Sequence, residues 1–171
     1  MSLSKIRVSF RTLFFWGGIA CLTIFAGAYW IEYQFGIEPC PLCVLQRYVL
    51  LGITGVFLIG TLHNVGDWGR IVYCSILFFL GMLGVLLSSR HVWLQYADHP
   101  VAATCTAGLE KMLSFMPLLD VLKEVLTSSN ACSKVDFTVF HVSLATWSFL
   151  FFLGLTLYSI LIFTLQTKRR I

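Results

Sequence analysis

Residues 142–165 read VSLATWSFLFFLGLTLYSILIFTL and contain no charged side chain. Because an α-helix rises about 1.5 Å per residue, a run of this length spans the roughly 30 Å hydrocarbon core of a bilayer. Similar runs of about 20 residues cover 13–31, 43–62 and 71–89. Membrane β-strands alternate apolar and polar residues over about ten positions, whereas these runs are continuously apolar. The sequence therefore predicts an all-α membrane protein in which residues 1–171 form one four-transmembrane-helix bundle.

The composition agrees with lipid as the main solvent. Hydrophobic residues make up 58% of the 171 residues and charged residues only 12%, whereas a soluble domain is about one half apolar and about one quarter charged. A soluble fold of this length could not bury so much apolar surface. The net charge of +4 is small and dispersed, which argues against a nucleic-acid-binding protein.

The first apolar run has a second interpretation. Basic residues precede it, and Ala26-Gly27-Ala28 matches the small-residue pattern of a signal-peptidase site. The run continues past this site to Trp30 and Ile31, which favours a retained first helix. Cleavage by signal peptidase would not change the side of the membrane on which the later loops are predicted to lie.

Basic residues are distributed unevenly between the two predicted sides of the membrane. The chain ends and the loop 63–70 together carry seven Lys or Arg and one acid. The loops 32–42 and 90–141, with Arg47 close to the first of them, carry five Lys or Arg and seven acids. Because Lys and Arg accumulate on the cytoplasmic side, both chain ends are predicted to be cytoplasmic and these two loops to face outward.

The six cysteines fall into two groups. Cys21 and Cys74 lie in the middle of predicted helices, where a free cysteine acts as a small hydrophobic residue. The other four lie two in each outward loop, on the oxidising side of the membrane where disulfides persist. These four are Cys40, Cys43, Cys105 and Cys132.

The segment Cys40-Pro41-Leu42-Cys43 joins the first outward loop to the second helix. Pro41 suits the first position of a helix, which places Cys43 in the first turn, where free N–H groups favour a thiolate. Arg47 follows four residues later on nearly the same helix face. Alone it fits an interfacial anchor, but beside two cysteines it is predicted to stabilise negative charge on the Cys43 sulfur and on a reduced electron acceptor.

The second outward loop, 90–141, contains an amphipathic pattern. Apolar residues recur at helical spacing over 109–116 and 119–126, on either side of Pro117. Neither piece is long enough to cross a bilayer, so a short amphipathic helix lying on the membrane surface is predicted. Cys105 and Cys132 bracket this stretch. A bridge between them would be either a structural staple or an exchangeable disulfide that a partner's thiolate attacks.

The motif CPLCVLQR at 40–47, followed by a long loop with two further cysteines, resembles the disulfide bond formation protein B family. The local similarity extends through HVWLQY at 91–96, ATC at 103–105 and NAC at 130–132. It covers nearly the whole chain. One departure concerns Gln46, because other members carry an acid there, and Gln46 is therefore given no role as a proton relay.

The resemblance implies a quinone-reducing protein-disulfide oxidoreductase in the bacterial inner membrane, with its cysteine loops in the periplasm. It implies a Cys105–Cys132 disulfide that oxidises a periplasmic thioredoxin-fold thiol oxidase of the DsbA type. A Cys40–Cys43 disulfide would then receive the electrons and pass them to ubiquinone or menaquinone.

The same resemblance assigns two residues to the quinone. Arg47 would contact it beside Cys43. His91, just after the third apolar run, sits where the family has a histidine near the quinone, although a histidine at a helix end is often only interfacial.

Three other functions compete with this prediction. The chain could be a four-helix membrane scaffold with structural disulfides. Cys40 and Cys43 have the spacing of a metal knuckle, but Cys105 and Cys132 form no second knuckle and an oxidising compartment disfavours free thiolates, so no metal is expected. In thiol enzymes of the vitamin K epoxide reductase type the loop pair precedes the CxxC pair, which is the reverse of the order here.

Overall fold

The computed structural model describes residues 9–36, 40–63, 66–96, 138–139 and 142–167. Four helices, α1 (Phe10–Phe35), α2 (Pro41–Leu62), α3 (Asp67–Tyr96) and α6 (Leu144–Thr167), account for most of them. All four are long and apolar enough to cross a membrane. The predicted all-α four-helix membrane fold is confirmed, whereas the interfacial helix predicted between Cys105 and Cys132 lies outside the described residues.

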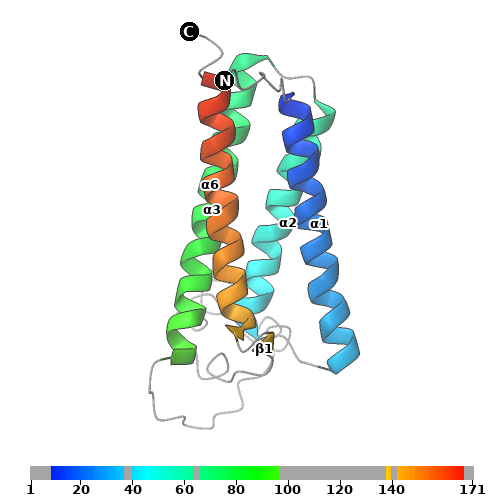
Figure 1. The fold of residues 1–171 in the computed structure, drawn as a ribbon, viewed down its shortest axis with the longest axis vertical. Helices are drawn as coiled ribbons and strands as arrows, with labels where there is room; N and C mark the ends of the chain where they lie inside the picture. The colour runs from blue at the N-terminus through cyan, green and yellow to red at the C-terminus, as the bar shows by residue number, and fades with distance from the viewer. Residues whose placement is uncertain (1–8, 37–39, 64–65, 97–137, 140–141, 168–171) are drawn as a thin grey trace, which may run out of the picture.

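The helices run alternately up and down the bundle (Figure 1). α2 packs between α1 and α3, and α3 packs along α6, whereas α1 and α6 touch only sparsely. The start of α1 and the end of α6 therefore lie at one end of the bundle. The start of α2 and the end of α3 lie at the other end (Figure 1), so residues 50 positions apart in the sequence can meet there.

A short antiparallel hairpin lies at that second end. Strand β1 (Thr138–Val139) pairs with β2 (Val142–Ser143), with Thr138 opposite Ser143. β2 leads directly into α6. The sequence analysis did not predict this hairpin, because two-residue strands leave no periodic signal.

Helices α1, α2 and α3 are longer than the apolar runs that revealed them. α3 begins at Asp67 and continues to Tyr96, whereas its apolar run covers only 71–89. Residues 90–96, which follow this run, contain no Gly or Pro, so no residue that commonly ends a helix stands directly after residue 89. His91 is therefore fixed on a helix rather than carried on a loop.

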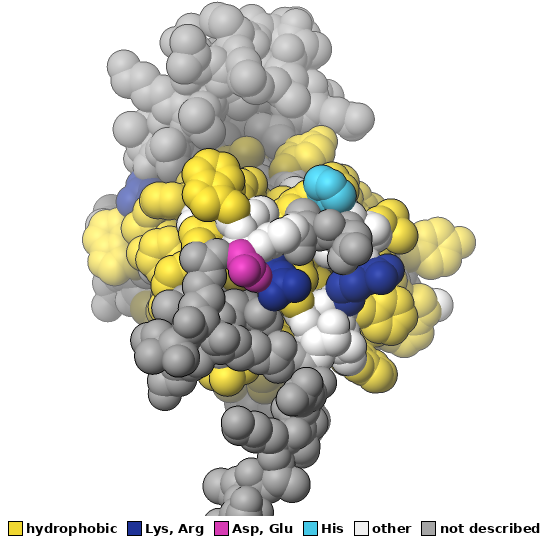
Figure 2. Space-filling model, turned by 90° about the horizontal axis from the view of Figure 1, so that it is seen from above, with side chains coloured by type: hydrophobic (Ala, Val, Ile, Leu, Met, Phe, Trp, Pro, Cys, Tyr) yellow, Lys and Arg dark blue, Asp and Glu magenta, His cyan; other side chains and the backbone are white. Residues whose placement is uncertain are grey.

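The sides of the bundle expose large apolar side chains, as a lipid-facing surface requires. Trp16, Phe79, Leu86 and Leu157 are each more than half exposed. Figure 2 views the bundle from the end where α1 starts, and the few charged side chains visible there are surrounded by hydrophobic ones. The flanks of the bundle are thus apolar, and this end adds a few charged side chains to an otherwise hydrophobic surface.

Small residues let α3 and α6 approach closely. Gly81, Gly84 and Ser88 lie on one face of α3 and are all buried. A Cβ atom added at Gly84 would overlap the Phe152 ring, and one added at Gly81 would lie 2.6 Å from the Thr156 hydroxyl. Helices in membranes associate through such close contacts because lipid is as apolar as their side chains.

We expect Gly84→Ala to destabilise the protein by about 1–3 kcal/mol, because the added methyl group must displace the Phe152 ring. The free energy of unfolding can be measured by titration with denaturing detergent in mixed micelles. Gly55→Ala is the matched control, since a Cβ there meets nothing within 4 Å. Equal stability of the two variants would contradict this packing.

Candidate functional site

Cys40 and Cys43 form a tight turn at the start of α2. Cys40 is extended (φ −68°, ψ 158°) and is the N-cap residue, and Pro41 occupies the first helical position. The Cys43 N–H donates to the Cys40 sulfur at 3.3 Å. The helix start predicted from Pro41 is therefore confirmed.

The two sulfurs lie 3.0 Å apart and are not joined by a disulfide. A disulfide bond is about 2.05 Å long, so small side-chain rotations would bring them to bonding distance. From the sequence, the N–H groups of the first turn were expected to stabilise a thiolate on Cys43. In the structure one of these groups, the Cys43 N–H, donates instead to the Cys40 sulfur. The arrangement is suited to cycling between a dithiol and a disulfide.

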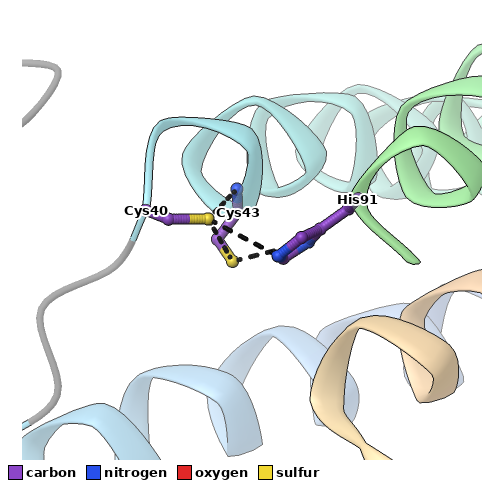
Figure 3. A group of neighbouring side chains, drawn as sticks. All are labelled: Cys40, Cys43 and His91. Carbon is purple, nitrogen blue, oxygen red and sulfur yellow. Dashed lines mark hydrogen bonds between the residues drawn. The ribbon is translucent and has the colours of Figure 1, made fainter. Parts of the chain in front are cut away.

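His91 reaches the two sulfurs from α3. Its Nε2 atom lies 3.8 Å from the Cys40 sulfur, and its Nδ1 atom lies 4.0 Å from the Cys43 sulfur. Figure 3 shows the ring extending from α3 to the first turn of α2. The side chain is only 4% exposed. The structure thus brings together three residues that the sequence analysis selected separately, and it places His91 against the cysteines.

Arg47 is directed toward α1. Its guanidinium forms an ion pair with Glu32 and stacks 4.7 Å above the centroid of the Tyr29 ring. Both charged side chains are mostly buried, at 18% and 19% exposure. The sequence analysis placed Arg47 beside Cys43 and missed Glu32. The missing signal was available, because an arginine near a membrane boundary requires a partner and Glu32 is the first acid after the first apolar run.

A groove of about 440 Å³ lies between α1 and α2 next to this ion pair. Aromatic and aliphatic side chains form most of its wall, and the Glu32–Arg47 pair supplies its charged groups. The aromatic wall residues are Phe25, Tyr29, Tyr33 and Tyr48. Such a groove, apolar with a few convergent polar groups, is suited to a flat apolar ligand that has polar edges.

Gln46 presents a buried amide on the inner face of α2. The side chain is 5% exposed, and its Nε2 atom has no hydrogen-bond partner among the described residues. Burying an amide donor without a partner is costly. Gln46 lies one turn after Cys43, so this donor is available to an acceptor that enters the bundle near the cysteines.

The remaining cysteines are divided between the core and the part of the chain that is not described. Cys21 and Cys74 are buried in the hydrophobic core of the bundle, as their predicted packing role requires. Cys105 and Cys132 lie outside the described residues. Of the four cysteines predicted to be redox-active, the structure therefore describes the pair at the start of α2.

Comparison with known proteins identifies relatives over most of the chain. The family model described as disulfide bond formation protein DsbB matches residues 10–162. A disulfide bond formation protein B of Nitrosococcus oceani is 36% identical, over 91% of this chain and 92% of the relative. The protein of the same name from Methylococcus capsulatus is 35% identical, over 90% and 93%.

A third relative of that name, from Xanthomonas euvesicatoria pv. vesicatoria, is 32% identical over 92% of both chains. The resemblance first noticed in the CPLCVLQR motif thus extends through all four helices. With paired thiols at the end of a four-helix membrane bundle, the chain belongs to the disulfide bond formation protein DsbB family.

Proposed function

We propose that this protein reoxidises a periplasmic thioredoxin-fold dithiol oxidase of the DsbA type and passes the electrons to a membrane quinone. The observation that carries the proposal is the 3.0 Å approach of the Cys40 and Cys43 sulfurs beside His91. Two exchangeable thiols held at the end of a membrane bundle can face a soluble partner and a lipid-borne acceptor.

The thiol chemistry would proceed by two exchanges. A thiolate of the partner attacks the Cys105 sulfur of a Cys105–Cys132 disulfide and releases Cys132 as a thiolate; the partner's second thiolate then displaces Cys105. The resulting loop dithiol reduces a Cys40–Cys43 disulfide in the same way. Two electrons and two protons move at each stage, so the partner leaves oxidised and the pair on α2 is left reduced.

The residues around the cysteines fit a quinone as the electron acceptor. A bound quinone, either ubiquinone or menaquinone, supplies a two-electron sink. Gln46 offers a buried N–H donor that no described residue satisfies, and a quinone carbonyl is an acceptor. Arg47 and His91 would hold the quinone, Arg47 from the aromatic groove and His91 from α3. Their role is to position the ring and to stabilise negative charge as it is reduced.

The charge distribution supports one orientation in the bacterial inner membrane. The end of the bundle formed by the start of α1 and the end of α6 would face the cytoplasm, since the sequence that flanks these helix ends carries most of the Lys and Arg outside the helices. Cys40 and Cys43 are at the opposite end (Figure 1). They would face the oxidising periplasm, where a DsbA-type partner is found.

We expect Cys43→Ser to lower quinone reduction by about a thousandfold or more, because the pair can no longer form a disulfide. The assay mixes purified protein, the reduced thioredoxin-fold partner and a soluble quinone, and follows quinone absorbance. Cys74→Ser, at a buried position in the core, is the control and should retain turnover. Turnover that survives Cys43→Ser would exclude the proposed relay.

We expect Glu32→Gln to raise the KM for quinone about tenfold, a loss of about 1.4 kcal/mol, because Arg47 loses its charged partner. Exchange between the partner and the loop cysteines should keep its rate, measured by rapid quenching without quinone. Asp67→Asn removes the other ion pair, with Arg70, and serves as control. An unchanged KM in Glu32→Gln would show that this ion pair does not organise the quinone site.

A further inference from the structure

Cys40, Cys43 and His91 bring one nitrogen-donor and two sulfur-donor side chains together at the end of the bundle. We propose that the reduced pair and His91 form a binding site for a thiophilic divalent cation, with Zn²⁺ as the ligand. The three ligand atoms all lie within 4.8 Å of one another. Two thiolates and one imidazole are donors that Zn²⁺ prefers, and three protein ligands leave a fourth tetrahedral position open.

The distances are close to those that a tetrahedral ion requires. With Zn–S near 2.3 Å and Zn–N near 2.0 Å, two bound sulfurs stand about 3.8 Å apart, and a sulfur and a nitrogen about 3.5 Å apart. The sulfurs are 3.0 Å apart. Nε2 of His91 lies 3.8 Å from the Cys40 sulfur and Nδ1 lies 4.0 Å from the Cys43 sulfur, and a single ring nitrogen lies within 4.8 Å of both sulfurs. The sulfurs must separate by less than 1 Å, and the binding nitrogen must approach the farther sulfur by about 1.3 Å at most, which rotation of the side chains provides.

Burial and charge also favour the ion. His91 is buried and both cysteines are half-buried, so a charge at this position would be costly alone. Zn²⁺ replaces the two thiol protons and leaves a site with no net charge from the ion and the two sulfurs. His91 comes from a different helix than the cysteines, so the ion would also join α3 to α2.

His91, as a third ligand, removes one reason against a metal site that was drawn from the sequence. A metal site was set aside because Cys105 and Cys132 form no second knuckle. The missing donor comes instead from α3, 48 residues after Cys43, and could not be assigned by cysteine spacing. An oxidising compartment disfavours free thiolates because it converts them to a disulfide. This objection therefore does not apply while the Cys40–Cys43 pair is reduced.

Binding is therefore expected to depend on redox state. A Cys40–Cys43 disulfide offers no thiolates, so only the dithiol form binds Zn²⁺, with release of two protons and no transfer of electrons. Binding would hold the pair reduced and block its reoxidation. This inhibition rests on the proposed function, whereas the binding itself does not.

The test uses the full chain purified in detergent, with Cys105 and Cys132 replaced by Ala so that the loop thiols cannot compete. Zn²⁺ is titrated against a chromophoric chelator before and after reduction. We expect about one equivalent to bind to the reduced protein only, and at least about tenfold weaker binding in His91→Ala. His63→Ala is the matched control, since His63 lies at the opposite end of the bundle and contacts Tyr73.

A second measurement covers the case in which His91→Ala does not fold. In the unsubstituted reduced chain, Zn²⁺ should slow alkylation of Cys40 and Cys43, read by mass spectrometry, at least about tenfold. Equal Zn²⁺ binding by the reduced and oxidised protein, unchanged affinity in His91→Ala, or no protection from alkylation would each overturn the site. Failure of quinone reduction without zinc would instead count against the proposed function alone.

Discussion

The hydrogen bond from the Cys43 N–H to the Cys40 sulfur, at the first turn of α2, is the interaction on which the candidate site depends. Pro41 fixes where the helix begins, and the extended N-cap residue turns its sulfur back so that it accepts from the N–H of Cys43, the third residue of the helix. The two sulfurs are thereby held within reach of each other before any partner binds. A helix that began one turn earlier or later would separate them or direct them to different neighbours.

Helix packing then brings a different neighbouring helix to each side of the start of α2. Because α2 lies between α1 and α3, the cysteines meet His91 on one side while Arg47 meets Glu32 on the other. Close packing of α3 on α6 at Gly81 and Gly84 supports the helix that carries His91. Thiol chemistry and the charged groove thus share one helix but use different neighbours, which suits a protein that connects a soluble reductant with a membrane-borne oxidant.

Much of this could be predicted from the sequence, and the limits have physical causes. Four apolar runs of membrane-spanning length, three of them without a charged residue, determine the fold class, and Pro41 between two cysteines marks a helix start. The approach of His91 to Cys40 could not be predicted, because it depends on which helices pack together and on α3 continuing to Tyr96. Arg47 was expected at Cys43 from helical spacing alone, but an ion pair with Glu32 is stronger than a contact along its own helix.

The most direct test of the account follows the redox state of the Cys40–Cys43 pair through one cycle. The full chain is isolated from membranes, alkylated and digested, and the peptide carrying both residues is weighed. We predict a disulfide as isolated, a dithiol after addition of the reduced thioredoxin-fold partner without quinone, and a disulfide again once quinone is added. A pair that remains in one state at all three stages would contradict a relay through this turn.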